Sequence, residues 1–460
     1  MKKLLPVLMV LVAMVLMYAS GGPSHELNKI RETDQMDIGV KMESLSPGVA
    51  FVTIALGGFR GILADMLWMR SERLKEEGSH YELLQLGDLV TKLEPRMAEV
   101  WSFHGWNMAY NVSVTYKEPE ERWRWVQNGF KLLRDEGLKH NPYDPTIHRE
   151  LGWIFQHKIG NDFDNAHNYY KRAWHTEMSA VFTDPNGKAN YDLPPDDPSW
   201  ATLKEVYKMD RELMQEIDEE YGPLDWRLPN SQAIYWAYRG KTHAKGFKHK
   251  QMVSMIYRAM ADQLTRGETI LLEGIPFALE RPDLSVLPRA LKSLAQAKEQ
   301  HGDIQHIKTA EKNFMELGVV TLDSYGREKE ARELFETLSE TYPEVIPQGV
   351  DDPFETLIYR EQKGFFGSAP SKQQAEAYVG STFFQAYLWE DMGDADRANG
   401  LMIRAKRFCQ QYMKDKLSNE EWKNRVGIDC DEIQKISREE VKRYYSQYRK
   451  PAKVKPKEEE

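Results

Sequence analysis

Histidine and acidic side chains near residue 165 are the first candidates for chemistry in this sequence. His167 and His175 lie two turns apart on an expected helix, and Asp162 and Asp164 precede them. These are side chains that bind zinc and other transition metals, but a metal site needs several protein ligands in one place. Further ligands would have to come from elsewhere in the chain. We therefore predict solvent-exposed histidines here and no metal site.

Other spacings that support catalysis are missing as well. The sequence contains no H-E-x-x-H, G-x-S-x-G, phosphate-binding loop or G-x-G-x-x-G pattern. His301 and His306 are five residues apart and so do not share a helix face. The adjacent carboxylates in "DDPSW" and "GVDDPFE" point apart, which favours turns and helix caps. We expect no catalytic residues, metal or other cofactor, and keep an enzyme built on a helical array as an alternative.

Aromatic residues form the other notable clusters. The segments "WSFHGWNMAY" and "RWRWV" bring Trp101, Trp106, Trp123 and Trp125 close together in the sequence. Such residues commonly pack between helices, which is the simpler interpretation. The alternative is a groove lined with aromatic rings that binds a partner. The elements that carry these residues determine which interpretation applies.

The periodicity of the chain predicts an all-α protein. Apolar residues recur at helical spacing over most of the sequence, whereas alternating strand patterns are scarce. A helix is expected over residues 197–222, where Gly222 ends it, and the longest irregular segment spans residues 182–200. The 460 residues, 41% of them hydrophobic, suffice for a large core or a long stacked one. The net charge of −9 argues against a nucleic-acid partner.

Three segments repeat one spacing of small and aromatic residues. In residues 314–343 this spacing is carried by Phe314, Leu317, Gly318, Thr321, Ala331, Phe335, Leu338 and Pro343. Similar copies begin at His148 and Phe383, and weaker ones cover residues 101–142 and 231–259. Small residues let two helices approach closely, and the proline ends the second helix. The pattern resembles the tetratricopeptide repeat (TPR), which implies an α-α superhelical solenoid, here with irregular insertions.

The TPR resemblance also implies where a partner binds. In TPR proteins the first helix of each pair lines the concave, ligand-binding face. The matching positions in the copy that begins at His148 include Arg149, Trp153 and Gln156, and Trp106 holds such a position in the preceding copy. Hydrogen bonding and ring stacking by these side chains could hold an extended peptide or a sugar. We predict that they contact the partner.

The N-terminus indicates export. Lys2 and Lys3 are followed by the apolar stretch 4–19 and then by small residues, the order of a secretory signal or an N-terminal membrane anchor. With either outcome the lysines stay inside and the remaining chain lies in the cell envelope, anchored to the inner membrane or periplasmic. The two cysteines, Cys409 and Cys430, could then form one disulfide, a question that the sequence leaves open.

The segment "GGFRGILADMLWMR", residues 57–70, is apolar yet contains three charged residues. Its apolar side chains fall on one helical stripe made of Phe59, Ile62, Leu63, Met66, Leu67 and Leu74. A membrane span would be apolar all round, so the stripe favours an amphipathic helix that opens the solenoid. Trp68 lies opposite the stripe and Arg70 falls on it, which indicates that another element contacts Trp68.

The expected organisation follows from these observations. It consists of a signal peptide or anchor (1–22), a linker and apolar segment (23–57), N-terminal TPR-like repeats (58–180), an irregular insertion plus helix (181–230), C-terminal TPR-like repeats (231–415), terminal helices (416–448) and a disordered tail (449–460). We predict a non-enzymatic scaffold or adaptor that binds proteins or peptides of a bacterial cell-envelope assembly. A SusD-like glycan- or solute-binding protein is the alternative.

Overall fold

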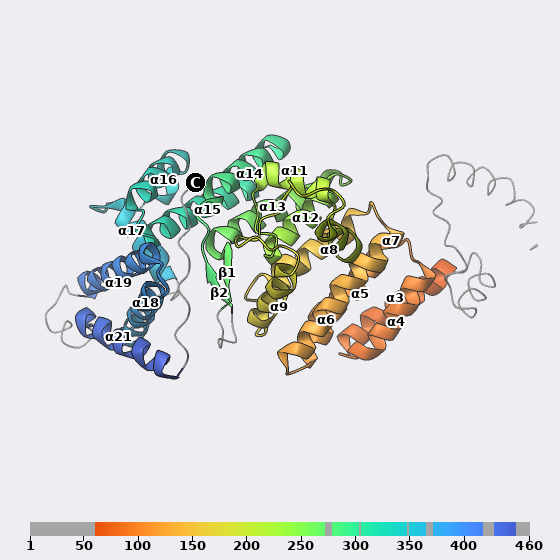
Figure 1. Cartoon of the computed structure of the whole chain (residues 1–460), viewed down its shortest axis with the longest axis horizontal. Helices are drawn as coiled ribbons and strands as arrows, with labels where there is room; N and C mark the ends of the chain where they lie inside the picture. Colours follow the sequence, from red (N-terminus) through yellow and green to blue (C-terminus); the bar gives the residue numbers. More distant parts are fainter. Residues whose placement is uncertain are drawn as a thin grey trace, which may run out of the picture. The chain divides into compact units, whose positions relative to one another are not determined.

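The protein is all-α apart from one short β-hairpin in the residues that the structure describes (Figure 1), as the sequence predicts. This computed structural model describes residues 60–271, 278–302, 305–346, 349–364, 371–416 and 427–447. No helix in these ranges is long and apolar enough to cross a membrane, and the predicted apolar stretch 4–19 lies outside them. Contacts divide the chain into two compact units, and the described residues up to Val100 belong to the first with Lys139–Asn141.

The first unit is a helical hairpin of α3 (Arg60–Glu76) and α4 (His80–Leu93), which pack against each other. Leu74 is buried, but Ile62 and Met66 are more than half exposed although they belong to the predicted packed stripe. Burial on α3 is therefore uneven along the stripe. The guanidinium of Arg70 lies 3.9 Å from the carboxylate of Glu82 in α4, which gives this charged stripe position a partner across the hairpin.

The second unit contains the remaining elements, which mostly pack against neighbours in the chain. They are α5 (Ala98–Trp106, which begins in the first unit), η3 (Asn107–Val112), η4 (Ser113–Thr115), α6 (Pro119–Lys131), η5 (Leu132–Gly137), α7 (Leu138–His140, whose last two residues belong to the first unit), α8 (Pro145–Trp153), η6 (Ile154–Ile159), α9 (His167–Ser179), α10 (Pro198–Thr202), η7 (Leu203–Tyr207), α11 (Arg211–Tyr221), α12 (Pro229–Lys241), α13 (Gly246–Arg266), β1 (Glu268–Ile270), β2 (Leu279–Arg281), α14 (Val286–His301), α15 (Gln305–Ser324), α16 (Glu328–Thr341), η8 (Pro343–Val345), α17 (Pro353–Gly364), α18 (Lys372–Met392), α19 (Ala395–Lys416) and α21 (Cys430–Gln447). The segments η3, η5, η6 and η7 are π-helical.

Each predicted repeat copy in this unit forms a pair of packed helical segments. The pairs are α5–η3 with α6, α8–η6 with α9, α12 with α13, α15 with α16 and α18 with α19. A Cβ atom added to Gly318 in α15 would lie 2.8 Å from Leu334 Cδ2 of α16 and 2.9 Å from Leu287 Cδ1 of α14. The close approach predicted at this glycine is thus confirmed, and α16 ends just before Pro343 as expected.

The helix predicted over residues 197–222 is broken, which corrects that expectation. Lys208 adopts a left-handed conformation with φ of 56°, so α10 and η7 are separated from α11. The guanidinium of Arg239 in α12 donates to the Lys208 carbonyl at 2.9 Å, and the Asp210 N–H donates to the Tyr235 hydroxyl at 2.7 Å. Side chains of α12 therefore supply the hydrogen bonds that a continuous helix would have made. Asp197 caps α10, as predicted for these carboxylate pairs.

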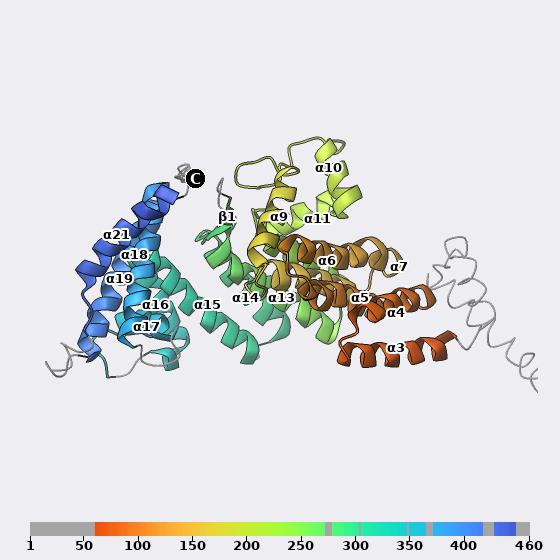
Figure 2. The same cartoon turned by 90° about the horizontal axis from the view of Figure 1, so that it is seen from below.

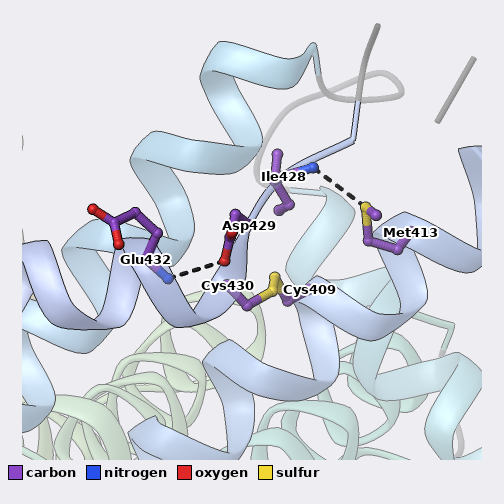
Figure 3. The surroundings of a disulfide bond; sticks show 6 residues. All are labelled: Cys409, Met413, Ile428, Asp429, Cys430 and Glu432. Carbon is purple, nitrogen blue, oxygen red and sulfur yellow. Dashed lines mark hydrogen bonds between the residues drawn. A yellow bond between two sulfur atoms is a disulfide. The ribbon is translucent and has the colours of Figure 1, made fainter. Parts of the chain in front are cut away.

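The helices α18, α19 and α21 group together at the C-terminal end of the described chain (Figure 2). A disulfide joins Cys409 in α19 to Cys430, the first residue of α21, with Cα atoms 6.3 Å apart (Figure 3). Beside it, the Asp429 carboxylate accepts a hydrogen bond from the Glu432 N–H at 3.0 Å and so caps the start of α21. The bond that the sequence left open is formed in this structure.

Candidate functional site

Two consecutive helix pairs contribute a row of contacting rings, here called the aromatic ladder, made of Trp106, Tyr110, Trp153, His157 and Phe163. Ring centroids are 5.6 Å apart between Trp106 and Tyr110, and 5.9 Å apart between Tyr110 and His157. The ring centroids of Trp153 and His157 are 4.5 Å apart, with only 9° between the ring planes. The ring centroid of Phe163 also lies 4.5 Å from that of His157. These separations are typical of attractive aromatic contacts.

The two helices that carry the ladder share an unusual local structure. Trp106 is the last residue of α5 and Trp153 is the last residue of α8, and a π-helical segment follows each of them directly. Tyr110 and His157 lie four residues further on, so each ring stacks on the tryptophan one turn before it. A π-helical turn inserts one residue into the helix and is often found at functional sites. Here it occurs at the end of the first helix in two consecutive helix pairs.

The ladder is open to solvent at one end. Tyr110 is buried, Trp106, Trp153 and His157 are half-buried, and Phe163 is 61% exposed. Burial and the neighbouring Lys158 ammonium lower the pKa of His157 below its ordinary value, so the neutral imidazole predominates at neutral pH. The ladder therefore presents flat, largely uncharged rings, a surface suited to stacking on an apolar or cyclic group of a partner.

A buried ion pair fixes the residue after Phe163. The ammonium of Lys158, which is fully buried, pairs with the carboxylate of Asp164, and Arg122 adds a second contact at 2.7 Å. Burial opposes ionisation of Asp164, but the Lys158 hydrogen bond, the Ala166 N–H and the nearby cations together lower the pKa of this carboxyl. The carboxylate is therefore charged at neutral pH and holds the loop at this point.

A second ion-pair cluster fixes the residue before Phe163. The buried ammonium of Lys171 in α9 lies 2.9 Å from Asp162 and 2.8 Å from Glu280 in β2. Arg266 at the end of α13 donates to the same Asp162 carboxylate at 2.7 Å. Phe163 thus lies on a loop that is tied down on both sides, and an exposed ring held in place loses little conformational freedom on binding.

The structure places the four predicted partner-binding residues in different settings. Trp106 and Trp153 both belong to the aromatic ladder. Arg149 is half-buried and pairs with the Glu150 carboxylate at 3.1 Å. Gln156 is 6% exposed and donates to Asp262 in α13 at 3.2 Å, so it is a packing residue between helices. The ladder brings together two of the four residues.

The histidines and acids considered first have other roles. His175 is buried rather than exposed, and burial lowers its pKa to about 4, which corrects the prediction of a solvated side chain. His167 is half-buried and lies 3.1 Å from Asp162. No group of three or more His, Cys, Asp or Glu side chains suited to a metal occurs among the described residues. Sequence reasoning missed His157 and Phe163, although both follow Trp153 in the segment "WIFQHKIGNDFD".

Comparison with known proteins does not assign this chain to a family. The chain matches no protein-family model, and a search of curated proteins finds no significant match. The aromatic ladder and its fixed loop are therefore the features on which a functional assignment rests.

Proposed function

We propose that this protein is a non-enzymatic, TPR-like scaffold on the outer side of the inner membrane that binds a protein or peptide through the aromatic ladder. The observation that carries the proposal is Phe163, a mostly exposed ring that packs against His157 with ring centroids 4.5 Å apart, while ion pairs hold the residues on both sides of it. Exposed aromatic rings on rigid supports are typical of residues that dominate protein interfaces.

The helix pairs give this ladder its place in a repeat architecture. Trp106 and Trp153 lie on the first helices of consecutive pairs, which is where the TPR resemblance puts the binding face. The disulfide between Cys409 and Cys430 favours an oxidising compartment such as the periplasm. An extended peptide with an apolar or ring-bearing side chain is the partner that the uncharged rings suit best.

The experiment is affinity capture from the native cells with the full-length, tagged chain in detergent. We expect a reproducible partner whose recovery falls roughly tenfold with Phe163→Ala, the loss expected for one interface ring. Phe247→Ala removes an even more exposed ring at another place and should leave recovery unchanged. Trp153→Ala should also reduce capture, but Phe163 is the sharper test because its exposed ring contributes little to folding.

Two results would count against this proposal. One is the absence of any reproducible partner, and the other is equal recovery by wild type and Phe163→Ala. Rings beside Asp162 and Asn161 also suit stacking on a sugar, which makes glycan binding the second candidate. Binding to a glycan array that disappears with Phe163→Ala would favour that candidate over the peptide partner.

A further inference from the structure

The turn between α12 and α13 concentrates positive charge in a chain that is acidic overall. From Arg239 to Lys250 the sequence contains Arg239, Lys241, Lys245, Lys248 and Lys250 but no acidic residue, whereas the whole chain has a net charge of −9. Lys245 is exposed and Lys250 half-buried, and neither forms an ion pair with another described residue. Their charges are therefore available to an anionic partner.

The two most exposed aromatic side chains among the described residues lie in the same region. Phe247 is 74% exposed and lies between Lys245 and Lys248 in the sequence, and Tyr143 is 67% exposed. The ring of Tyr143 lies 4.9 Å from that of His243, in a tilted arrangement. The Lys248 ammonium donates to the Thr146 hydroxyl at 2.8 Å, which brings the start of α13 to the start of α8, where Tyr143 lies.

The basic aromatic patch is the name used here for the side chains around this turn, which are Tyr143, His243, Lys245, Phe247, Lys248 and Lys250. Its surroundings are open at the turn, because a Cβ atom added to Gly246 would meet no atom within 4 Å. The backbone at Gly246 is therefore uncovered, and two exposed rings accompany the cations around it. Lys248 is partly compensated by Asp144, whose carboxylate lies 3.9 Å away, so Lys245 and Lys250 supply the uncompensated charge.

We propose that the basic aromatic patch binds the surface of an anionic phospholipid membrane. Aromatic rings partition into the boundary between lipid headgroups and acyl chains, and lysines beside them reach the lipid phosphates. A peptide partner would instead be expected to find a groove with apolar walls. Nucleic acid is disfavoured by the acidic balance of the chain. The proposal does not depend on the function proposed for the aromatic ladder.

Vesicle binding by the full-length chain tests this proposal. Co-sedimentation is compared between vesicles of phosphatidylcholine alone and vesicles that contain 30% phosphatidylglycerol, with the first as background for any contribution of the N-terminal segment. We expect the preference for phosphatidylglycerol to fall at least about tenfold in Lys245→Glu/Lys250→Glu, because each lysine near an anionic surface adds measurably to binding. Phe247→Ala should weaken binding to the anionic vesicles, whereas the ladder variant Phe163→Ala should not.

A matched control separates the patch from net charge. Lys204→Glu/Lys329→Glu changes the charge by the same amount at exposed sites outside the patch and should retain the preference. An environment-sensitive dye on Thr242→Cys, an exposed position in the turn, should shift to shorter wavelength with the anionic vesicles, and a dye on Lys329→Cys should not.

Three outcomes would overturn the proposal. They are equal binding to both kinds of vesicle, an equal loss of preference in the control double variant, and a response of the Thr242 dye to polyglutamate but not to vesicles. The last outcome would identify the patch as a site for an acidic protein.

Discussion

At the scale of single residues, the region around the ladder depends on buried charges whose ionisation is set by their partners. Lys158 and Lys171 are almost fully buried, yet each has a carboxylate within ion-pair distance. Removing one partner of a buried pair leaves an uncompensated charge, which is why such residues are sensitive to substitution. Glu150 differs from these residues, because burial raises the pKa of its carboxyl to about 7 and Arg149 offsets this only in part.

Glu150 gives a prediction for the pH dependence of stability. Its folded-state pKa is above the ordinary value of 4.5, so the stability it contributes is present below pH 4.5 and is lost as the pH rises through about 7. Glu150→Gln cannot ionise, so this variant should be more stable than wild type at pH 8, by up to about 3 kcal/mol, and close to it at pH 4.5. Denaturant titrations at several pH values measure this difference.

Denaturant unfolding of Glu333→Gln at the same pH values provides the control, since Glu333 is an exposed carboxylate on α16. This variant should follow the wild-type curve at every pH. Comparison of each variant with wild type also cancels the opposite contribution of His148, whose pKa is lowered to about 4 by burial. A Glu150→Gln curve parallel to wild type from pH 4.5 to 8 would show that this carboxyl titrates normally in the folded protein.

At the scale of elements, the packing of neighbouring helices depends on a few close approaches. The helices α5 and α6 meet where Gly105 and Gly129 face each other: a Cβ atom on Gly129 would lie 2.5 Å from the Gly105 carbonyl oxygen. Backbone cannot move away as a flexible side chain can. This contact also positions the end of α5, where Trp106 begins the aromatic ladder.

The glycines of two helices should respond in opposite ways to the same substitution. Gly129→Ala should lower the free energy of unfolding by about 1–3 kcal/mol, the usual cost of overpacking. Gly380 in α18 has room, because its added Cβ would find the nearest atom at 3.6 Å, so Gly380→Ala should raise stability by about 0.5–1 kcal/mol. Thermal or denaturant unfolding of both variants tests the prediction, and a neutral Gly129→Ala would refute the close approach.

At the scale of the whole molecule, the disulfide connects structure to cellular location. The bond between Cys409 and Cys430 joins α19 to α21, and these are the only cysteines of the chain. Such a bond persists in oxidising compartments and is rare in the cytosol. The predicted N-terminal export segment and the disulfide therefore support the same location through unrelated chemistry.

Thiol labelling tests this connection. Protein taken from cells with rapid acid quenching and then denatured should react with a maleimide only after reduction. The Cys409→Ala/Cys430→Ala variant should lose about 2–4 kcal/mol of unfolding free energy in the C-terminal helices, as is typical when a native disulfide is removed. In the stability measurement, wild-type protein whose disulfide has been reduced is the matched control, because it keeps both cysteine side chains but lacks the bond. Two reactive thiols in the unreduced sample would contradict both the bond and the export proposal.

The all-α class, the helix pairs and several helix ends of this protein were predictable from the sequence alone. Helical periodicity and the scarcity of strand patterns gave the all-α class, and the repeated small residues gave the helix pairs, because both patterns reflect local geometry. The turn chemistry of Asp197 and the helix stops at Gly222 and Pro343 were likewise predictable, since caps depend on a few adjacent residues. Trp106 and Trp153 were predicted as partner-contacting residues from their matching positions in two sequence copies, and the structure places both in the aromatic ladder.

Side-chain burial, the helix break at Lys208 and the contacts of Phe163 depend on segments that are distant in the sequence. Gln156 is buried against Asp262, and the helix break at Lys208 is stabilised by side chains of α12, so neither could be inferred from neighbouring sequence. The contact of Phe163 with His157 depends on a loop whose residues Asp162 and Asp164 are paired with Lys171 and Lys158. Local sequence sets which helices form, whereas the exposure of a ring or the pairing of a buried charge depends on which helices pack together.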